Sequence, residues 1–257
     1  MMAVYLPGFV FKLYERHLWG QIKNGPVPRH VGLIMDGNRR AARALGKLPH
    51  DGHRMGFKKV RNVLRWCWAL DIRVVTLFAF STENFLRPPI EVDTLMRLAR
   101  EQFLAVLTDP DVHKHEVQVK AIGRLHLLPS EVQDAIHQAE KATAHYDRYT
   151  LQVAIGYGGR AEVVDAVRAV ARKVKEGNLT LDAISEKYIS QHLYTNGTPD
   201  PDIIIRTSGE ERLSGFLLWQ SAYSEFYFAD VFFPNFRKID LWRAIRTYQR
   251  RDRRFGT

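Results

Sequence analysis

The stretch from His30 to Gly56 holds the side chains best suited to chemistry in this chain. An apolar run from Val31 to Met35 leads directly into Asp36-Gly37-Asn38 and two arginines, Arg39 and Arg40. An aspartate can hold a hard cation, a glycine lets backbone approach a ligand, and arginines donate to anionic oxygens. An isolated Asp-Gly-Asn is usually only a turn. Here the flanking apolar run and the cations favour a site for phosphate and metal.

A second group of cations and hydroxyls follows another apolar run. Arg206, Arg212 and Ser214 fall within nine residues of one another. Guanidinium groups bind phosphate oxygens bidentately and serine hydroxyls add neutral donors, so the spacing favours a diphosphate site. A solvated loop with an Arg–Glu pair is the alternative. Glu225, downstream among aromatic and small residues, is either a salt-bridge partner or a metal ligand that pairs with Asp36; two carboxylates with substrate phosphates and water would suit Mg²⁺.

A third polar group, Ser81-Thr82-Glu83-Asn84 followed by Arg87, closes a strongly apolar run. The Asn84 amide can orient a substrate or help to relay a proton, and capping a helix or turn is its alternative role. Arg87 can face phosphate. His53, in the opening stretch, is a candidate general base or phosphate ligand, with a structural role as the alternative.

Strands and helices alternate along the chain and must position these groups. Apolar runs predict strands at 31–35, 72–80, 117–122, 151–155 and 202–206, with a sixth within 225–233. Helical spacing predicts helices at 9–22, 53–70, 91–107, 129–145, 160–175, 181–192 and 240–250, with turns at 24–28 and 51–53. The alternation predicts an α/β fold in which a mostly parallel, six-stranded sheet is flanked by helices. We expect one domain over 1–257, with an amphipathic helix and turn at 1–27 and a helix and basic tail at 240–257.

The carboxyl ends of parallel strands meet at one edge of a sheet, which is where ligands bind. Those ends are Asp36–Arg40, Ser81–Asn84, Gly123–Arg124, Gly156–Arg160 and Arg206–Gly209. Glycines, cations and hydroxyls are therefore expected to gather at one edge, which predicts a phosphorylated ligand.

Composition agrees with this interpretation. The net charge of +10 indicates an anionic partner, and the single Cys67 excludes an internal disulfide and fits a reducing cytosol. No signal peptide is expected, because Pro7-Gly8 interrupts an N-terminal apolar run that carries no early positive charge, and no run is long enough to cross a membrane. For the helix at 9–22, packing on the protein's own body is the default interpretation and a membrane-surface helix is the alternative.

Two other classes of function have weaker support. Gly156–Ala161 nearly matches the G-x-G-x-x-A pattern of dinucleotide-binding proteins, but Glu176, at the required spacing, falls at a helix end rather than after a strand. The basic tail Arg-Arg-Asp-Arg-Arg-Phe is the best case for nucleic-acid binding, and a solvated basic end explains it more simply.

The motifs together resemble the cis-prenyltransferase family, the undecaprenyl and dehydrodolichyl diphosphate synthases. The resemblance rests on HVGLIMDGNRR, GHRMG, FAFSTENFLRP, IGYGGR, IIIRTSGEERLSGFLLWQSAYSEFYF and RDRRFG, which occur in this order from residue 30 onward. The N-terminal extension and the RTSGE spelling resemble archaeal or eukaryotic members. The resemblance implies a Mg²⁺-dependent homodimer with a hydrophobic tunnel enclosed by the helices, which we expect along the 91–107 helix. It also implies the condensation of isopentenyl diphosphate units onto an allylic diphosphate, giving a long-chain Z-polyprenyl diphosphate that serves as precursor of a glycosyl carrier lipid.

The resemblance also implies roles for individual residues. Asp36 would bind Mg²⁺ with Glu225 and assist departure of the allylic diphosphate, while Asn84 and His53 would remove a proton from isopentenyl diphosphate. Arg254 and Gly256 would form a C-terminal R-x-G element that completes the partner subunit's site. The substrate-binding residues would be Gly37, Asn38, Arg39, Arg40, His53, Ser81, Thr82, Glu83, Phe85, Arg87, Arg206, Arg212, Leu213 and Ser214.

Three positions depart from the family pattern. Ala41 replaces an aromatic residue and Pro49 replaces an arginine that many members carry, which changes one substrate-facing wall and one phosphate contact. Phe85 replaces a frequent tryptophan conservatively. We therefore expect a cytosolic, membrane-associating, homodimeric enzyme. The rival is a non-catalytic subunit of a heteromeric synthase, but such subunits lose the aspartate motif that this chain keeps.

Overall fold

A computed structural model describes residues 8–251. Its centre is a six-stranded sheet in the order β3-β4-β2-β1-β5-β6, in which every neighbouring pair runs parallel. The strands are β1 (His30–Ile34), β2 (Val74–Ser81), β3 (Val117–Ile122), β4 (Tyr149–Tyr157), β5 (Ile203–Thr207) and β6 (Glu225–Ala229). The expected α/β fold with six strands is confirmed, and the sheet is parallel throughout the described chain.

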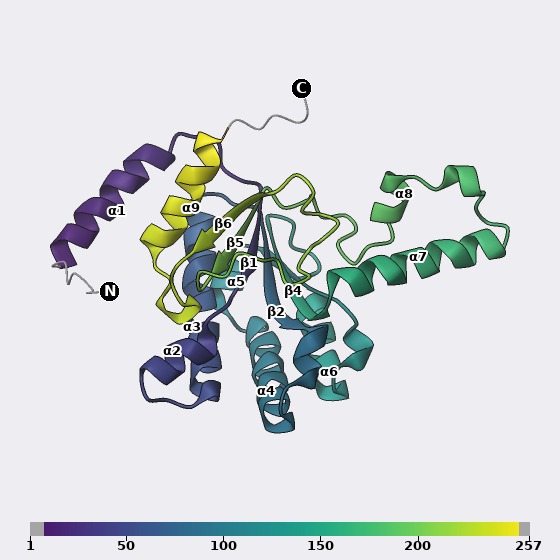
Figure 1. The fold of residues 1–257 in the computed structure, drawn as a ribbon, viewed down its shortest axis with the longest axis horizontal. Coiled ribbons are helices and arrows are strands. Elements are labelled where there is room, and N and C mark those ends of the chain that lie inside the picture. Colours follow the sequence, from purple (N-terminus) through teal and green to yellow (C-terminus); the bar gives the residue numbers. More distant parts are fainter. Residues whose placement is uncertain (1–7, 252–257) are drawn as a thin grey trace.

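Helices connect the strands and cover the sheet (Figure 1). They are α1 (Gly8–Ile22), α2 (Asn38–Ala44), α3 (Pro49–Ala69), α4 (Pro89–Val106), α5 (Pro110–Lys114), α6 (Ser130–Thr143), α7 (Gly159–Lys175), α8 (Glu186–Ser190) and α9 (Lys238–Arg250). In the part of the chain that the structure describes, no helix is long and apolar enough to span a bilayer.

Three local predictions differ from the structure. The expected turn at 51–53 is wrong, because Pro49 starts α3 four residues earlier than His53 and the Asp51 side chain accepts a hydrogen bond from the Leu48 amide at that helix start. The single helix expected at 181–192 is instead a short 3₁₀ turn at 181–183 followed by α8. The short helix α5 was not expected; Asp109 caps it by accepting from the Asp111 amide at 2.9 Å.

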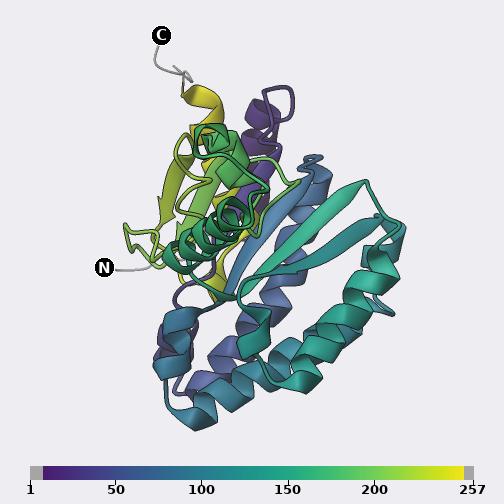
Figure 2. The same ribbon diagram turned by 90° about the vertical axis from the view of Figure 1, so that its right-hand side faces the viewer.

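The sheet buries apolar residues on both faces, as its parallel strands require. Alternate residues such as Leu33 and Leu77 pack with side chains from α3, α4, α6 and α9 in the larger core cluster. Ile34 and Ile204 point the other way, onto Phe216 and Leu217 in the loop after β5. Figure 2 shows α4 and α6 along one side of the sheet and α7 on the other.

The N-terminal helix packs against the C-terminal one, side by side in Figure 1. Leu18 of α1 is fully buried, and the rings of Trp19 and Trp242 lie 5.4 Å apart. Arg243 of α9 donates to the Tyr14 hydroxyl at 3.3 Å. The apolar side of α1 thus packs into the protein's own core. This confirms the interpretation that the helix packs on the body of the protein.

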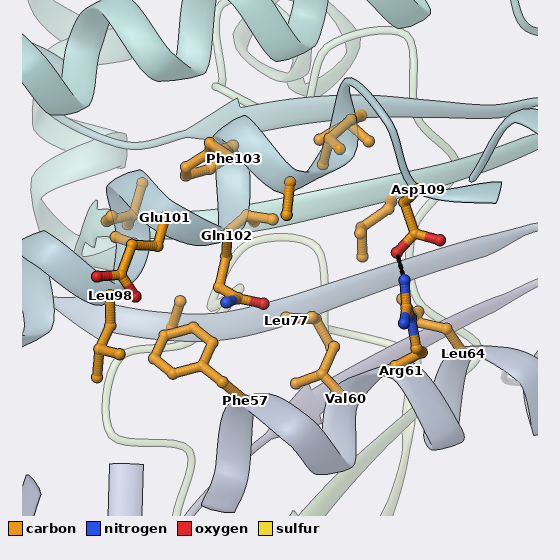
Figure 3. A pocket seen from close by; sticks show the side chains of 18 of the residues that line it. Phe57, Val60, Arg61, Leu64, Leu77, Leu98, Glu101, Gln102, Phe103 and Asp109 are labelled. Atoms are coloured by element: carbon orange, nitrogen blue, oxygen red, sulfur yellow. Dashed lines mark hydrogen bonds and ion pairs between the residues drawn. The ribbon is translucent and has the colours of Figure 1, made fainter. Parts of the chain in front are cut away.

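An apolar cavity of 670 Å³ lies between α3, α4 and one face of the sheet (Figure 3). Its walls include Phe57 and Leu64 from α3, Leu98 and Phe103 from α4, and Leu77 from β2. It runs along the 91–107 helix, where the tunnel was expected.

Candidate active site

A polar cavity of 800 Å³ lies at the carboxyl ends of β1, β2 and β5. Inside the sheet, β1 has β2, the next strand along the chain, on one side and β5 on the other. Ligands of parallel sheets commonly bind at such a point, where the strand order reverses. The polar residues that line it are Asp36, Asn38, Arg39, Arg40, Arg43, Lys47, His53, Ser81, Asn84, Arg87, Glu91, Arg206, Arg212 and Ser214. Most of the predicted site residues are thus brought together.

Asp36 lines this cavity, two residues beyond β1. Its carboxylate accepts from the Gly37 amide at 2.6 Å and from Arg206 Nη2 at 2.8 Å, and Arg40 Nη2 lies 3.5 Å away. Burial raises the pKa of the carboxyl, but the bonds from Arg206 and Gly37 outweigh burial and hold the pKa below its usual value. Asp36 is therefore ionised at neutral pH.

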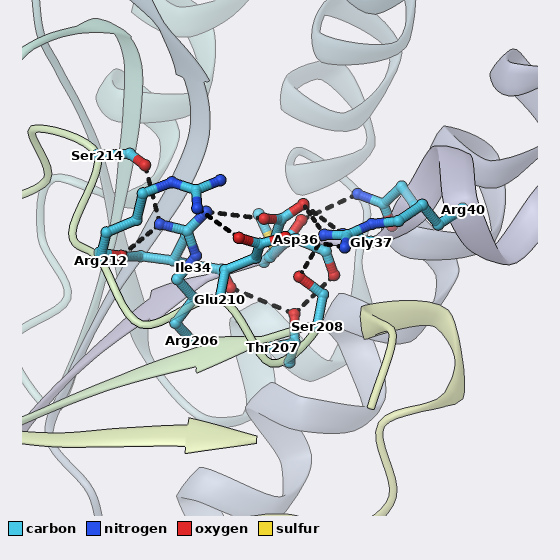
Figure 4. A network of polar contacts seen from close by, with 12 residues as sticks. Ile34, Asp36, Gly37, Arg40, Arg206, Thr207, Ser208, Glu210, Arg212 and Ser214 are labelled. Atoms are coloured by element: carbon cyan, nitrogen blue, oxygen red, sulfur yellow. Dashed lines mark hydrogen bonds and ion pairs between the residues drawn. The ribbon is translucent and has the colours of Figure 1, made fainter. Parts of the chain in front are cut away.

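Arg206 links the two strand ends (Figure 4). Its side chain is only 4% exposed, since β5 is an interior strand and Arg206 pairs with Ile34 in the register. Nη2 bonds Asp36 while Nη1 donates to Ser214 Oγ at 2.8 Å and to the Arg212 carbonyl. Nε is buried with no partner among the described atoms. The buried Arg206 guanidinium, held by these bonds, places a fixed positive charge in the wall of the cavity.

Arg40 and Arg212 share one carboxylate, Glu210 (Figure 4). Arg40 donates to Glu210 Oε1 at 3.0 Å and to Ser208 Oγ at 2.7 Å, and Arg212 pairs with the other oxygen of Glu210. Both guanidinium groups remain substantially exposed, at 43% and 61%. They can therefore turn towards an anion without leaving a buried charge behind.

Three glycines of the opening stretch bring α2, α3 and the loop before α9 close together. Gly37 has φ +95°, which favours glycine, and a Cβ there would lie 2.7 Å from the Phe232 ring. A Cβ on Gly52 would lie 2.1 Å from the Asn38 carbonyl oxygen, and one on Gly56 would lie 2.4 Å from Asn38 Oδ1. The glycines at 52 and 56 thus let α3 pack directly on the start of α2, which places His53 in the cavity.

His53 meets a residue that sequence reasoning missed, Glu91. His53 Nε2 lies 3.2 Å from Glu91 Oε1, which also accepts from Arg87 at 3.0 Å, while Arg39 lies 3.6 Å from the other oxygen. Burial lowers the pKa of His53 and Glu91 opposes this, with a net lowering. The imidazole is therefore neutral at neutral pH and able to accept a proton. The signal for Glu91 was its spacing four residues after Arg87 at a helix start.

Asn84 lines the cavity and also caps the turn that follows β2. Its side-chain Oδ1 accepts from the Ser81 backbone amide at 3.1 Å. The side-chain NH₂ of Asn84 takes no part in this bond and can donate to another group. Among the other predicted substrate residues, Phe85 packs on Phe80 with ring centres 4.9 Å apart, and Glu83 is exposed. Four of the predicted substrate residues do not line the cavity: Thr82, Glu83, Phe85 and Leu213.

Asp36 and Glu225, the two carboxylates predicted to bind Mg²⁺, do not come together in this chain, and their metal role stays a prediction. Glu225 pairs with Ile203, the first residue of β5, whereas Asp36 follows the carboxyl end of β1. The two carboxylates thus lie at opposite ends of a parallel sheet, and Glu225 instead pairs with Arg251. Among residues 8–251 no three His, Cys, Asp or Glu side chains gather as a metal site. The predicted tail residues Arg254 and Gly256 lie outside the described residues.

The residues that follow β3 and β4, which were expected at the site, instead make contacts within the protein. Arg124 forms a two-bonded ion pair with Asp165 at 2.8 and 2.9 Å. The Gly159 amide donates to the Gly215 carbonyl at 2.7 Å, so the glycines of 156–159 allow close packing with the loop after β5. Of the departures from the family pattern, Pro49 lines the cavity whereas Ala41 is 2% exposed and does not.

The cavity is strongly cationic. Within the described chain its lining carries seven arginine and lysine side chains against two carboxylates, Asp36 and Glu91. It shares Met35, Ala79, Phe80 and Leu95 with the apolar cavity, so the two cavities adjoin. The arrangement suits a ligand with a polyanionic head and a long apolar tail.

Comparison with known proteins gives the same assignment. A family model described as "Putative undecaprenyl diphosphate synthase" matches residues 34–256. A tritrans,polycis-undecaprenyl-diphosphate synthase (geranylgeranyl-diphosphate specific) of Methanopyrus kandleri is 54% identical over 96% of this chain and 91% of its own. One of the same description from Pyrococcus horikoshii is 52% identical over 98% and 97% of the two chains.

Two solved structures are also similar. Lavandulyl diphosphate synthase from Lavandula x intermedia, in complex with dimethylallyl diphosphate, has a TM-score of 0.85 and 38% identity over 90% of this chain and 99% of that one. A probable undecaprenyl diphosphate synthase from Campylobacter jejuni has a TM-score of 0.73 and 31% identity over 90% and 100%. With its parallel sheet and its cationic cavity beside an apolar one, the chain belongs to the undecaprenyl diphosphate synthase family of cis-prenyltransferases.

Proposed function

We propose that this prenyltransferase condenses isopentenyl diphosphate units, with Z geometry, onto geranylgeranyl diphosphate to make a long-chain polyprenyl diphosphate. The observation that carries the proposal is the adjoining pair of cavities, one cationic and one apolar, that meet at Met35 and Leu95. The choice of primer and the long product follow the descriptions of the relatives at 54% and 52% identity. Such a product would serve as precursor of a glycosyl carrier lipid.

The two diphosphates would occupy opposite sides of Asp36. Arg39 and Arg40 would hold the allylic diphosphate, because both guanidinium groups are exposed towards the cavity. Arg212 and Ser214, backed by the buried Arg206, would hold isopentenyl diphosphate. The allylic tail would extend past Met35 into the apolar cavity, where it is removed from water.

Mg²⁺ is the cofactor we propose, and the donor set fits only if substrate supplies most of the ligands. Asp36 offers one ionised carboxylate in a cavity that is otherwise cationic, and Mg²⁺ characteristically binds one or two carboxylates together with substrate phosphates and water. When bound, the ion supplies charge neutralisation for the diphosphate that leaves.

The chemistry breaks one bond and forms another. The allylic C1–O bond breaks as diphosphate leaves, the double bond of isopentenyl diphosphate attacks C1, and a proton is lost from its C2 to set the new double bond. Neutral His53, held by Glu91, would accept that proton. Asn84 would orient the substrate through its free NH₂ and, as an amide, would not act as the base.

A homodimer and peripheral membrane contact belong to the same proposal. Apolar side chains are exposed on α7, which projects from the body of the protein in Figure 1: Val164 is 44% and Val167 50% exposed. Burial of this surface against a second copy would remove them from water. Light scattering coupled to gel filtration tests the dimer, and flotation with anionic vesicles tests the membrane contact.

The experiment that tests the function is incorporation of labelled isopentenyl diphosphate with Mg²⁺ and a panel of primers: dimethylallyl, geranyl, farnesyl and geranylgeranyl diphosphate. We expect the highest kcat/KM with geranylgeranyl diphosphate. Equal rates with all primers would contradict the proposed primer. No incorporation by well-folded protein would favour the second candidate, a non-catalytic subunit of a heteromeric synthase.

A further inference from the structure

Four strongly exposed apolar side chains lie on the elements that form the polar cavity, and we refer to them as the apolar rim. Leu45 and Leu48, in the loop between α2 and α3, are 58% and 61% exposed. Leu86, just before α4, and Ile90, at its start, are 89% and 82% exposed. None of the four lines either cavity. Single exposed leucines are common on proteins, but a group of this exposure marks a contact surface.

Ion pairs join the elements that carry the two halves of the apolar rim. Arg39 of α2 lies 3.6 Å from Glu91 of α4, and His53 of α3 lies 3.2 Å from the same carboxylate. Ile90 immediately precedes Glu91, and the loop 45–48 connects α2 to α3. In Figure 1, α2 and α4 lie at the lower edge of the protein. Both halves of the apolar rim therefore lie at the end of the sheet where the polar cavity is.

The backbone holds the loop 45–48 in an outward position. The Gly46 amide donates to the Arg43 carbonyl at 3.0 Å. The Lys47 amide donates to the Ala42 carbonyl at 2.9 Å, and this pair of bonds is a common ending of α-helices. Gly46 has φ +65°, as this ending requires, and a Cβ there would meet no atom within 4 Å. Ordered backbone thus presents the two leucines of the loop to solvent.

Two cations alternate with these leucines and have no acidic partner. Arg43 and Lys47 are exposed, line the polar cavity and contact no carboxylate within the described chain. The other arginines that line this cavity each pair with a carboxylate. No Asp or Glu occurs between residues 37 and 50. Arg43 and Lys47 can therefore bind an external anion without breaking an ion pair.

Exposed leucines that alternate with such cations match the surface of a bilayer with anionic headgroups. Leucine side chains gain by leaving water for the acyl boundary, and each cation gains near an anionic headgroup. A rigid protein partner on this face would cover the cavity that has to admit the substrates. A bilayer instead holds the primer, because a molecule with a long apolar tail and a diphosphate places the diphosphate among the headgroups.

We propose that the apolar rim, with Arg43 and Lys47, docks this protein on an anionic bilayer so that the polar cavity faces the headgroups. The inference rests on the proposed function, because it assigns a prenyl diphosphate to the cavity, and it adds the surface through which the membrane contact is made. Docked in this way, the cavity receives the primer from the bilayer surface, and the apolar tail does not have to cross bulk water.

Two double variants remove the apolar contacts on either side of the cavity. They are Leu45→Ser with Leu48→Ser, and Leu86→Ser with Ile90→Ser. Co-sedimentation with vesicles of phosphatidylglycerol and phosphatidylcholine measures the partition coefficient of the protein. We expect each double variant to lower this coefficient about tenfold or more, because the burial of two apolar side chains is lost.

A matched control removes two exposed apolar side chains elsewhere. Leu181 and Ile184, in the segment between α7 and α8, are 72% and 38% exposed and line neither cavity. Leu181→Ser with Ile184→Ser should bind vesicles as wild type does. An equal loss in this control would overturn the inference, because it would mean that any exposed apolar side chain contributes.

Arg43→Gln with Lys47→Gln tests the electrostatic part of the docking. We expect wild type to prefer vesicles with phosphatidylglycerol over pure phosphatidylcholine, and this variant to bind the anionic vesicles about tenfold or more weakly. Lys175→Gln with Lys187→Gln removes two exposed charges from α7 and α8 and is the control. It should keep the wild-type preference.

Activity measurements separate docking from catalysis. Leu45 and Leu48 line neither cavity, so their double variant should match wild type when the primer is supplied in detergent. With the primer supplied in phosphatidylglycerol vesicles, its kcat/KM should fall together with the partition coefficient. Light scattering coupled to gel filtration should give the wild-type mass.

The outcomes distinguish this inference from the function on which it rests. If wild type elongates the primer but does not bind anionic vesicles, or if either apolar variant binds them as wild type does, the inference is overturned and the function stands. A changed mass of the apolar variants would also overturn it, since the apolar rim would then be an interface between copies. If folded wild type incorporates nothing with primer in detergent, the proposed function itself fails.

Discussion

Asp36 and Arg206, which are 170 residues apart in the chain, form an ion pair of 2.8 Å between the ends of two neighbouring parallel strands. Arg206 comes from the interior of the sheet and is nearly inaccessible, whereas Asp36 is 30% exposed to the cavity. The buried Arg206 guanidinium thus holds the ionised Asp36 carboxylate in a fixed position facing the substrate. The ion pair connects the residues after β1 with those at the end of β5.

The first prediction concerns Arg206→Lys. Lysine keeps the charge but cannot bond Asp36 and Ser214 together in the plane of a guanidinium. We expect kcat/KM for isopentenyl diphosphate to fall about 10- to 100-fold, equivalent to about 1–3 kcal/mol. Arg160→Lys, an exposed change at the start of α7 that does not line the cavity, is the control and should be unaffected. Steady-state kinetics at fixed primer give the answer, and equal losses in both variants would contradict the special role of Arg206.

The second prediction concerns Glu91→Gln. Burial lowers the pKa of His53 and the Glu91 carboxylate raises it, so loss of that negative charge should lower the pKa further. A less basic His53 accepts a proton less readily, and we expect kcat to fall about tenfold or more. NMR titration of the His53 ring proton measures the first effect. Asp93→Asn, an exposed change on the same helix, is the control, and a raised His53 pKa in Glu91→Gln would refute the assignment.

The third prediction concerns stability against pH through His30, which is outside the active site. Burial lowers the pKa of His30 to about 4, while Nε2 lies 2.7 Å from the Thr76 hydroxyl and Nδ1 2.7 Å from the Pro199 carbonyl. Because the unfolded chain takes up this proton at about pH 6.5 and the folded chain does not, stability is full above 6.5 and falls by up to about 3 kcal/mol towards pH 4.

Urea unfolding at several pH values tests this prediction. His30→Gln should flatten the pH dependence between 6.5 and 4, whatever its effect on stability at neutral pH. His126→Gln, at an exposed position, should leave the dependence as in wild type. A wild-type slope in His30→Gln would show that other groups cause the acid sensitivity.

The fourth prediction concerns the packing of α1. Leu18 is fully buried against α9, so Leu18→Ala should lower the free energy of unfolding by about 3 kcal/mol. Leu13, on the same helix, is 59% exposed, and Leu13→Ala should change stability by less than about 0.5 kcal/mol. Equal effects in chemical denaturation would mean that α1 does not use one face for the protein's own core.

Much of the fold could be predicted because parallel, fully buried strands are continuous apolar runs. The runs at 31–35 and 202–206 both became strands, and their ends supplied Asp36 and Arg206. Helix boundaries were harder to predict at places where tertiary packing outweighs the local sequence signals. The turn expected at Asp51-Gly52-His53 became helix because Pro49 starts α3 and Gly52 allows it to contact α2.

The site was only partly predictable for a geometric reason. Sequence shows which residues follow strands but not the end of the sheet at which a carboxylate lies, so Glu225 was paired with Asp36 although it starts β6. Glu91 was missed because its role depends on contact with His53, which is 38 residues away. The ion pair between Arg61 of α3 and Asp109 at the start of α5 likewise joins distant parts of the chain, and no local pattern indicates such a contact.

The measurement that tests the central claim most directly compares wild type with Asp36→Asn for incorporation of labelled isopentenyl diphosphate onto geranylgeranyl diphosphate in the presence of Mg²⁺. The asparagine can still accept from Arg206, so circular dichroism and melting should match wild type. We predict that wild type makes long polyprenyl diphosphates and that the variant loses about 10³-fold or more in rate. Comparable incorporation by the two proteins would contradict the assignment of Asp36 as the residue on which the reaction depends.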